Sequence, residues 1–84
     1  MRKFIYFSAP WCGPCTLFGP IMDKIAERYP VEKINVQEKP EVAEQYGIKS
    51  IPTTLLVDDN NEVARHVGAA NEAKIVDMFH EHEG

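Results

Sequence analysis

The chain has 84 residues, 44% hydrophobic and 26% charged, which is typical of a globular protein and not of a disordered one. This length predicts one small domain over residues 1–84, which buries only about 60% of the surface of its extended chain. The net charge of −4 gives no reason to expect binding to nucleic acid or to a membrane. No apolar run approaches the roughly 20 residues of a membrane span, so we expect a cytoplasmic protein.

The first half of the chain predicts a strand, a long helix and a second strand. Residues 3–7 predict a strand, and its apolar run from Phe4 to Phe7 is typical of a strand buried on both faces of a sheet. Apolar residues then recur at helical spacing over residues 13–29. Pro20 lies inside this helix and is expected to kink it, because proline cannot donate a backbone hydrogen bond. Residues 31–36 predict a strand parallel to the first.

The second half predicts a short helix, a β-hairpin and a last helix. Residues 40–46 form a helical segment that begins at Pro40 and is followed by Gly47. Residues 53–57 and 62–67 are predicted strands, joined by a turn at residues 58–61. Asn71 is a suitable N-cap for the last helix. That helix is expected to bury three residues on its inward face: Ile75, Val76 and Phe79.

The two cysteines of the chain, Cys12 and Cys15, lie at the junction between the first strand and the first helix. Unpaired N–H groups and the helix dipole favour negative charge at Cys12, and a thiolate is the form that attacks a disulfide. Pro14 suits the first helical turn. Because Cys15 lies one turn further along, the two sulfurs are close enough to form a reversible disulfide.

Two other interpretations of the cysteine pair are open: half of a metal site, or two buried apolar side chains. A zinc or iron–sulfur module usually needs four ligands, and the sequence has no second cysteine pair. The histidines lie far along the chain, at His66, His80 and His82. A single Cys-x-x-Cys in such a protein is more often catalytic than structural.

Residues 11–15 read Trp-Cys-Gly-Pro-Cys, which is the active-site motif of the thioredoxin family. A second family marker is an Ile-Pro dipeptide that opens a later strand, here Ile51-Pro52. Further matches before the last helix are Gly68 and Ala69. Over essentially its whole length the chain resembles a shortened thioredoxin. The resemblance implies a minimal thioredoxin fold of the α/β class, βαβαββα, with a four-stranded mixed sheet flanked by helices.

The resemblance also implies a thiol–disulfide oxidoreductase, with Cys12 as the attacking nucleophile and Cys15 as the resolving thiol. The Ile51–Pro52 bond is implied to be cis, and the backbone of Ile51 to face the thiols, where it can pair with an extended substrate. Trp11 is expected to be about half exposed and to flank the thiols. The remaining motif and groove positions implied to contact substrate are Gly13, Pro14, Gly68 and Ala69.

No bound cofactor is implied beyond the redox-active disulfide. The expected partners of a monomeric chain are NADPH-dependent thioredoxin reductase and disulfide-containing protein substrates, with ribonucleotide reductase as a substrate by analogy. The alternative is a glutaredoxin-like enzyme recharged by glutathione, which the short chain favours. The Gly-Pro pair between the cysteines speaks against it, and so does the absence of a Gly-Gly stretch followed by acidic residues near Gly68.

The chain departs from the family pattern at Tyr6, six residues before Cys12. Thioredoxins typically have a buried aspartate at this position, thought to accept the proton of the resolving thiol. No residue of this chain inherits that role. Lys33 matches a family lysine beneath the active site but loses its usual partner. We therefore expect the proton acceptor to be missing and Cys12 to titrate in a single step.

Overall fold

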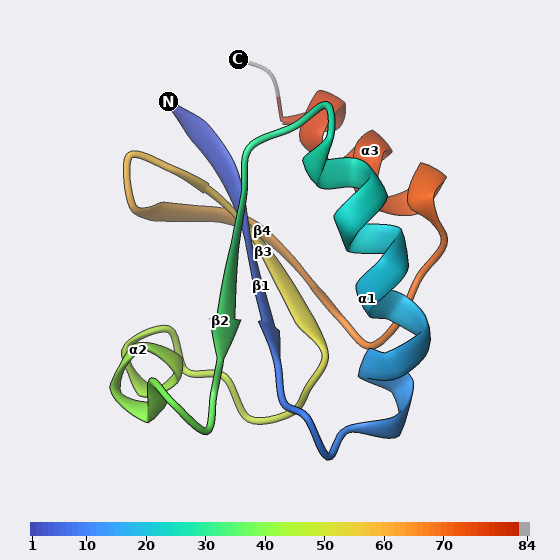
Figure 1. The fold of residues 1–84 in the computed structure, drawn as a ribbon. Coiled ribbons are helices and arrows are strands. Elements are labelled where there is room, and N and C mark those ends of the chain that lie inside the picture. Colours follow the sequence, from blue (N-terminus) through green and yellow to red (C-terminus); the bar gives the residue numbers. More distant parts are fainter. Residues whose placement is uncertain (83–84) are drawn as a thin grey trace.

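The computed structural model describes residues 1–82, which form a mixed β-sheet flanked by helices in the order βαβαββα (Figure 1). The strands are β1 (Arg2–Ser8), β2 (Val31–Asn35), β3 (Thr53–Asp58) and β4 (Asn61–Val67). The helices are α1 (Gly13–Ala26), α2 (Pro40–Gln45) and α3 (Glu72–Glu81). The strand order is β2-β1-β3-β4, with β1 parallel to β2 and antiparallel to β3, and β3 antiparallel to β4. The predicted fold class, element order and strand directions are confirmed.

The strand β1 lies inside the sheet and is covered on both faces, which explains its unbroken apolar run. Helices α1 and α3 cover one face and α2 lies on the other (Figure 1). Phe4 and Tyr6 pack on the α1 and α3 side, whereas Ile5 and Phe7 pack on the α2 side. Successive side chains of a strand point to opposite faces, so a strand with two covered faces must be apolar throughout.

The helix α1 ends at Ala26, three residues earlier than residues 13–29 predict. The backbone N–H groups of Arg28 and Tyr29 both donate to the carbonyl of Ile25, at 3.0 and 2.9 Å, in a tightened last turn. The following Pro30 disfavours helical backbone at Tyr29 and so ends the helix. The apolar spacing continues past this end because the Tyr29 ring still packs against the core, 6.3 Å from the ring of Phe4. Pro20 lies inside α1, and the kink stays a prediction.

The helix α3 begins at its predicted cap, since the Asn71 side chain accepts a hydrogen bond from the backbone of Lys74 at 2.9 Å. Its inward face differs from the prediction. Ile75 and Met78 are buried, whereas Val76 and Phe79 are only partly buried at the edge of the same cluster. Three- and four-residue spacing fits both sets, and the position of α3 against α1 decides between them.

The turn between β3 and β4 has two residues, Asp59 and Asn60, instead of the four predicted. Both have positive φ angles, 51° and 74°, as in the type I′ turns that suit the twist of a hairpin. Asp58 and Asn61 therefore pair across the strands. One further irregularity follows: the register shifts between Leu56 and Val57, which places a β-bulge in β4.

Candidate active site

The disulfide between Cys12 and Cys15 lies where β1 leads into α1, with the two Cα atoms 5.2 Å apart. Cys12 is the N-cap of α1, and its Sγ accepts a hydrogen bond from the backbone N–H of Cys15 at 3.2 Å. This is the predicted helix-end environment, in which N–H groups and the dipole favour negative charge on sulfur. Both cysteines are 6% exposed in the disulfide form, so burial does not distinguish them.

A segment far along the chain completes the surroundings of the disulfide. Ile51 and Val36 pack against a small cluster formed by Ala9 and the two cysteines. The Ile51–Pro52 peptide bond is cis, as expected. The backbone N–H of Gly68 donates to the carbonyl of Pro52 at 2.8 Å, and Gly68 has a φ of +97° that favours glycine. The tertiary fold thus gathers the predicted Ile51, Pro52 and Gly68 at one end of the sheet.

On one side of the disulfide lies a hollow of about 150 Å³, here called the apolar hollow. Its lining includes Trp11, Val36, Ala43, Ile48, Lys49 and Ile51. Trp11 is 69% exposed, more than the half predicted, because it precedes the helix and stands at the open rim. A hollow with an aliphatic floor and an exposed aromatic rim can accept an apolar side chain of a bound molecule.

On the other side lies a cavity of about 290 Å³, here called the polar cavity. Its lining includes Tyr6, Ser8, Cys15, Thr16, Lys33 and Asn35. The ammonium group of Lys33 forms an ion pair with Asp23 of α1, so Lys33 does have a partner, although not the one typical of the family. The hydroxyl group of Tyr6 is buried and makes no hydrogen bond of ordinary geometry with residues 1–82. Burial raises the pKa of Tyr6, and the side chain of Ser8 offsets part of this rise.

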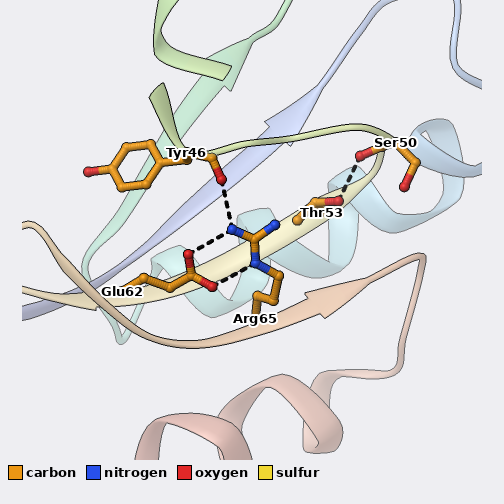
Figure 2. A network of polar contacts seen from close by, with 5 residues as sticks. All are labelled: Tyr46, Ser50, Thr53, Glu62 and Arg65. Carbon is orange, nitrogen blue, oxygen red and sulfur yellow. Dashed lines mark hydrogen bonds and ion pairs between the residues drawn. The ribbon is translucent and has the colours of Figure 1, made fainter. Parts of the chain in front are cut away.

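The segment that carries Ile48 and Ile51 is held at both of its ends (Figure 2). At one end, Arg65 of β4 donates to the carbonyl of Tyr46, the residue that caps α2, at 2.7 Å. At the other end, the hydroxyl of Thr53 donates to the carbonyl of Ser50 at 2.7 Å. These two contacts fix the chain that forms much of the lining of the apolar hollow.

Arg65 is itself oriented by Glu62, in a bidentate ion pair with donor–acceptor distances of 2.6 and 2.7 Å (Figure 2). The guanidinium group lowers the pKa of Glu62 below its usual value. Residues three apart on a regular strand face opposite ways, so the sequence alone gives no signal for this pair. The bulge makes the contact possible, because Glu62 pairs with Val57 and Arg65 with Leu55, two positions on the same face of β3.

The thioredoxin family model matches residues 2–81 of the chain. The chain belongs to the thioredoxin family. It is 42% identical to thioredoxin 1 of Synechococcus elongatus over 80 residues, which cover 90% of this chain and 75% of that protein. It is equally 42% identical to a thioredoxin of Chlorobaculum thiosulfatiphilum over 82 residues, 93% of this chain and 76% of the relative.

Solved structures agree with the sequence relatives. A mutant thioredoxin from Halobacterium salinarum superposes with a TM-score of 0.90 at 32% identity, covering 99% of this chain and 75% of the other. The thioredoxin of Fasciola hepatica gives a TM-score of 0.87 at 30% identity, covering 98% and 81%. The fold is therefore the thioredoxin fold. With its redox-active Cys12–Cys15 disulfide, this thioredoxin is a thiol–disulfide oxidoreductase, and nothing in these comparisons favours the glutaredoxin-like alternative.

Within residues 1–82, no three His, Cys, Asp or Glu side chains gather as a group that could hold a metal ion. Over the same residues, no helix combines the length and the apolar character that crossing a membrane would require.

Proposed function

We propose that this thioredoxin, acting as a monomeric domain over residues 1–84, reduces disulfides in protein substrates, with Cys12 as nucleophile and Cys15 as resolving thiol. The observation that carries these roles is the hydrogen bond from the backbone of Cys15 to the Sγ of Cys12, at 3.2 Å. Negative charge on the Cys12 sulfur is stabilised there by the end of α1. Cys15 instead lines the polar cavity, one turn into the helix.

The reaction has two exchange steps. In the first, the Cys12 thiolate attacks one sulfur of the substrate disulfide, forms a mixed disulfide and releases the other substrate sulfur as a thiolate, which takes a proton from solvent. In the second, Cys15 loses its proton and its thiolate attacks the Sγ of Cys12. The bond between Cys12 and the substrate breaks, and the second substrate thiolate leaves. Two electrons have then passed from the dithiol to the substrate, and the Cys12–Cys15 disulfide remains.

The substrate is proposed to lie across the exposed surface beside Cys12. Gly13 and Pro14 are exposed at the start of α1, and apart from its chain neighbours and the helix backbone no atom lies within 4 Å of the position that a Cβ at Gly13 would take. An extended peptide would pair with the backbone of Ile51 and place an apolar side chain against Trp11 in the apolar hollow. The segment of Gly68 and Ala69 borders this surface through the contact of Gly68 with Pro52.

The oxidised protein needs two electrons to react again. We propose an NADPH-dependent thioredoxin reductase as their source, in a cytoplasm that keeps thiols reduced, and ribonucleotide reductase as one protein substrate. The membership of the thioredoxin family supports these partners.

The test is the reduction of a protein disulfide coupled to NADPH oxidation in two parallel assays. One assay supplies thioredoxin reductase, and the other supplies glutathione with glutathione reductase. We expect turnover in the first assay and its loss in the Cys12→Ser variant. Turnover in the glutathione assay alone would refute the proposed reductase, and no turnover in either assay would refute the proposed function.

A further inference from the structure

The Tyr6 side chain combines an apolar contact with a hydroxyl group whose one polar influence is the nearby side chain of Ser8. Its ring packs edge-to-face on Phe18, with the ring centroids 5.6 Å apart, and the residue is only 3% exposed. Its hydroxyl group makes no hydrogen bond of ordinary geometry with residues 1–82. An unpaired buried hydroxyl costs stability, so a phenylalanine would fill this apolar position at lower cost.

The place of Tyr6 relates this hydroxyl to the chemistry of the disulfide. Tyr6 and Cys15 both line the polar cavity. Cys15 and Phe18 lie on the inward face of α1, three residues apart, so the helix that receives the Tyr6 ring also presents the Cys15 side chain. The cavity volume of about 290 Å³ is large enough for several water molecules.

We propose that the Tyr6 hydroxyl is a positioning group for the second exchange step, donating a hydrogen bond to the Cys15 sulfur as that sulfur becomes a thiolate. The proposal rests on the proposed role of Cys15 as the resolving thiol. A hydrogen bond to a charged sulfur favours the charged form and so makes Cys15 available for attack near neutral pH.

The chemistry differs from that of a carboxylate in the same place. Because burial raises the pKa of Tyr6, its hydroxyl keeps its proton and acts as a donor, not as a base. The proton of Cys15 leaves through the water of the polar cavity to solvent. The Cys15 thiolate then forms its bond with Cys12, and the displaced substrate thiolate takes a proton from solvent.

No other titratable residue of the cavity lining accepts a hydrogen bond from Tyr6, and the uncharged side chain of Ser8 is the polar neighbour that acts on its hydroxyl. The titratable residues of the lining are Tyr6 from β1, Cys15 from α1 and Lys33 from β2. The charge of Lys33 is balanced by its ion pair with Asp23. The strand β3 contributes Thr54, which pairs with Tyr6 across the sheet, does not titrate and does not line the cavity.

The direct test measures the Cys15 thiol alone, in a reduced Cys12→Ala protein, by its rate of alkylation as a function of pH. Tyr6→Phe removes only the hydroxyl, and we expect the apparent pKa of Cys15 to rise by about one pH unit. Thr54→Val is the matched control, because Thr54 has the other buried hydroxyl without a partner in residues 1–82 and lies outside the cavity lining. It should leave the apparent pKa unchanged. No shift in Tyr6→Phe, or an equal shift in Thr54→Val, overturns the proposal.

A second measurement follows the reaction in the protein with both cysteines. A rise of one pH unit lowers the thiolate fraction about tenfold, but a more basic thiolate is about threefold more nucleophilic, so Tyr6→Phe should slow resolution of the mixed disulfide about threefold. The first exchange step should be unchanged, and the free energy of unfolding unchanged or higher. An equal slowing of both steps overturns the proposal. A protein that reduces no disulfide refutes the proposed function instead, while the Cys15 titration still decides on the hydrogen bond.

Discussion

The apolar hollow and the polar cavity lie on opposite sides of one disulfide and differ in volume and in the residues that line them. The first holds about 150 Å³ and has Trp11 at an open rim, whereas the second holds about 290 Å³ and contains a buried hydroxyl at Tyr6. Cys15 lines the second and not the first. We infer a division of work, in which substrate side chains are recognised on one side and protons leave on the other.

The largest effect should come from the thiols themselves, because the proposed division needs Cys12 on the substrate side. Cys12→Ser should abolish turnover, whereas Cys15→Ser should accumulate a covalent mixed disulfide with a protein substrate. Mass spectrometry of the trapped species identifies the linked cysteine. A species linked through Cys15 in the Cys12→Ser variant would show that the roles of the two thiols are reversed. It would contradict the proposed division between the two sides of the disulfide.

The next effect concerns the polar cavity, where Tyr6→Asp replaces a packed ring with a carboxylate. We expect a loss of about 3 kcal/mol or more of unfolding free energy, from the lost packing and from the desolvated charge. Desolvation raises the pKa of an aspartate in the folded protein above its pKa in the unfolded chain. The loss of unfolding free energy should therefore be smallest at pH values below the unfolded pKa and largest at pH values above the folded pKa. Urea unfolding at pH 3 and pH 8 measures the difference, since an unfolded aspartate has a pKa of about 3.9.

Tyr6→Phe is the control for that variant, since it keeps the ring and adds no charge. It should show no such pH dependence. The carboxylate of Tyr6→Asp should also raise the pKa of Cys12 and add a second inflection to its titration. A two-step titration of Cys12 in the unmutated protein, surviving Cys15→Ser, would contradict the expected absence of a proton acceptor.

The apolar hollow should be tested at its rim with Trp11→Ala. We expect the reduction of a protein disulfide to slow about tenfold, since an exposed tryptophan at a binding surface commonly contributes more than about 1 kcal/mol. Reduction of a small soluble disulfide should change much less. Val63→Ala is the control, because Val63 is also exposed but lies at the β4 bulge. Equal slowing with both substrates would mean that Trp11 affects the thiols and not recognition.

The smallest effect concerns the ion pair that holds the lining of the apolar hollow. Glu62→Gln should cost under about 1 kcal/mol of unfolding free energy at pH 7, as partly exposed ion pairs do. The pKa of Glu62 is lowered in the folded protein. The ion pair therefore contributes to the unfolding free energy at pH values above the pKa of the unfolded chain, and this contribution is lost as the pH falls through the pKa of the folded protein. The difference from the parent should therefore be smaller at pH 3 than at pH 7.

Glu44→Gln is the control for the ion pair, because Glu44 is exposed on α2 and its side chain forms no hydrogen bond or ion pair with residues 1–82. It should leave the unfolding free energy unchanged at both pH values. The alkylation profile of Cys15 should not respond to Glu62→Gln, because neither Glu62 nor Arg65 lines the polar cavity. A change in this alkylation profile would mean that the apolar hollow and the polar cavity are coupled through the segment between Tyr46 and Thr53.

The sequence by itself determined the element order and the position of the thiols. Its signals are local: an apolar run before Cys12, Pro14 in the first helical turn, Gly47 with its φ of +65° after α2, and the cap at Asn71. Each acts through backbone preferences or hydrogen bonds within a few residues, so it needs no knowledge of the rest of the chain.

Only the tertiary structure decided the burial of α3 at Met78, the contact of Arg65 with Tyr46, and the surroundings of Tyr6. Helical spacing allows several inward faces, and the packing against α1 selects one of them. A single bulged residue in β4 reverses which side chains share a face, and no local pattern predicts it. Tyr6 and Cys15 line the same cavity because β1, β2 and α1 meet around it, and the chemistry of a buried hydroxyl depends on the groups that the other elements place near it.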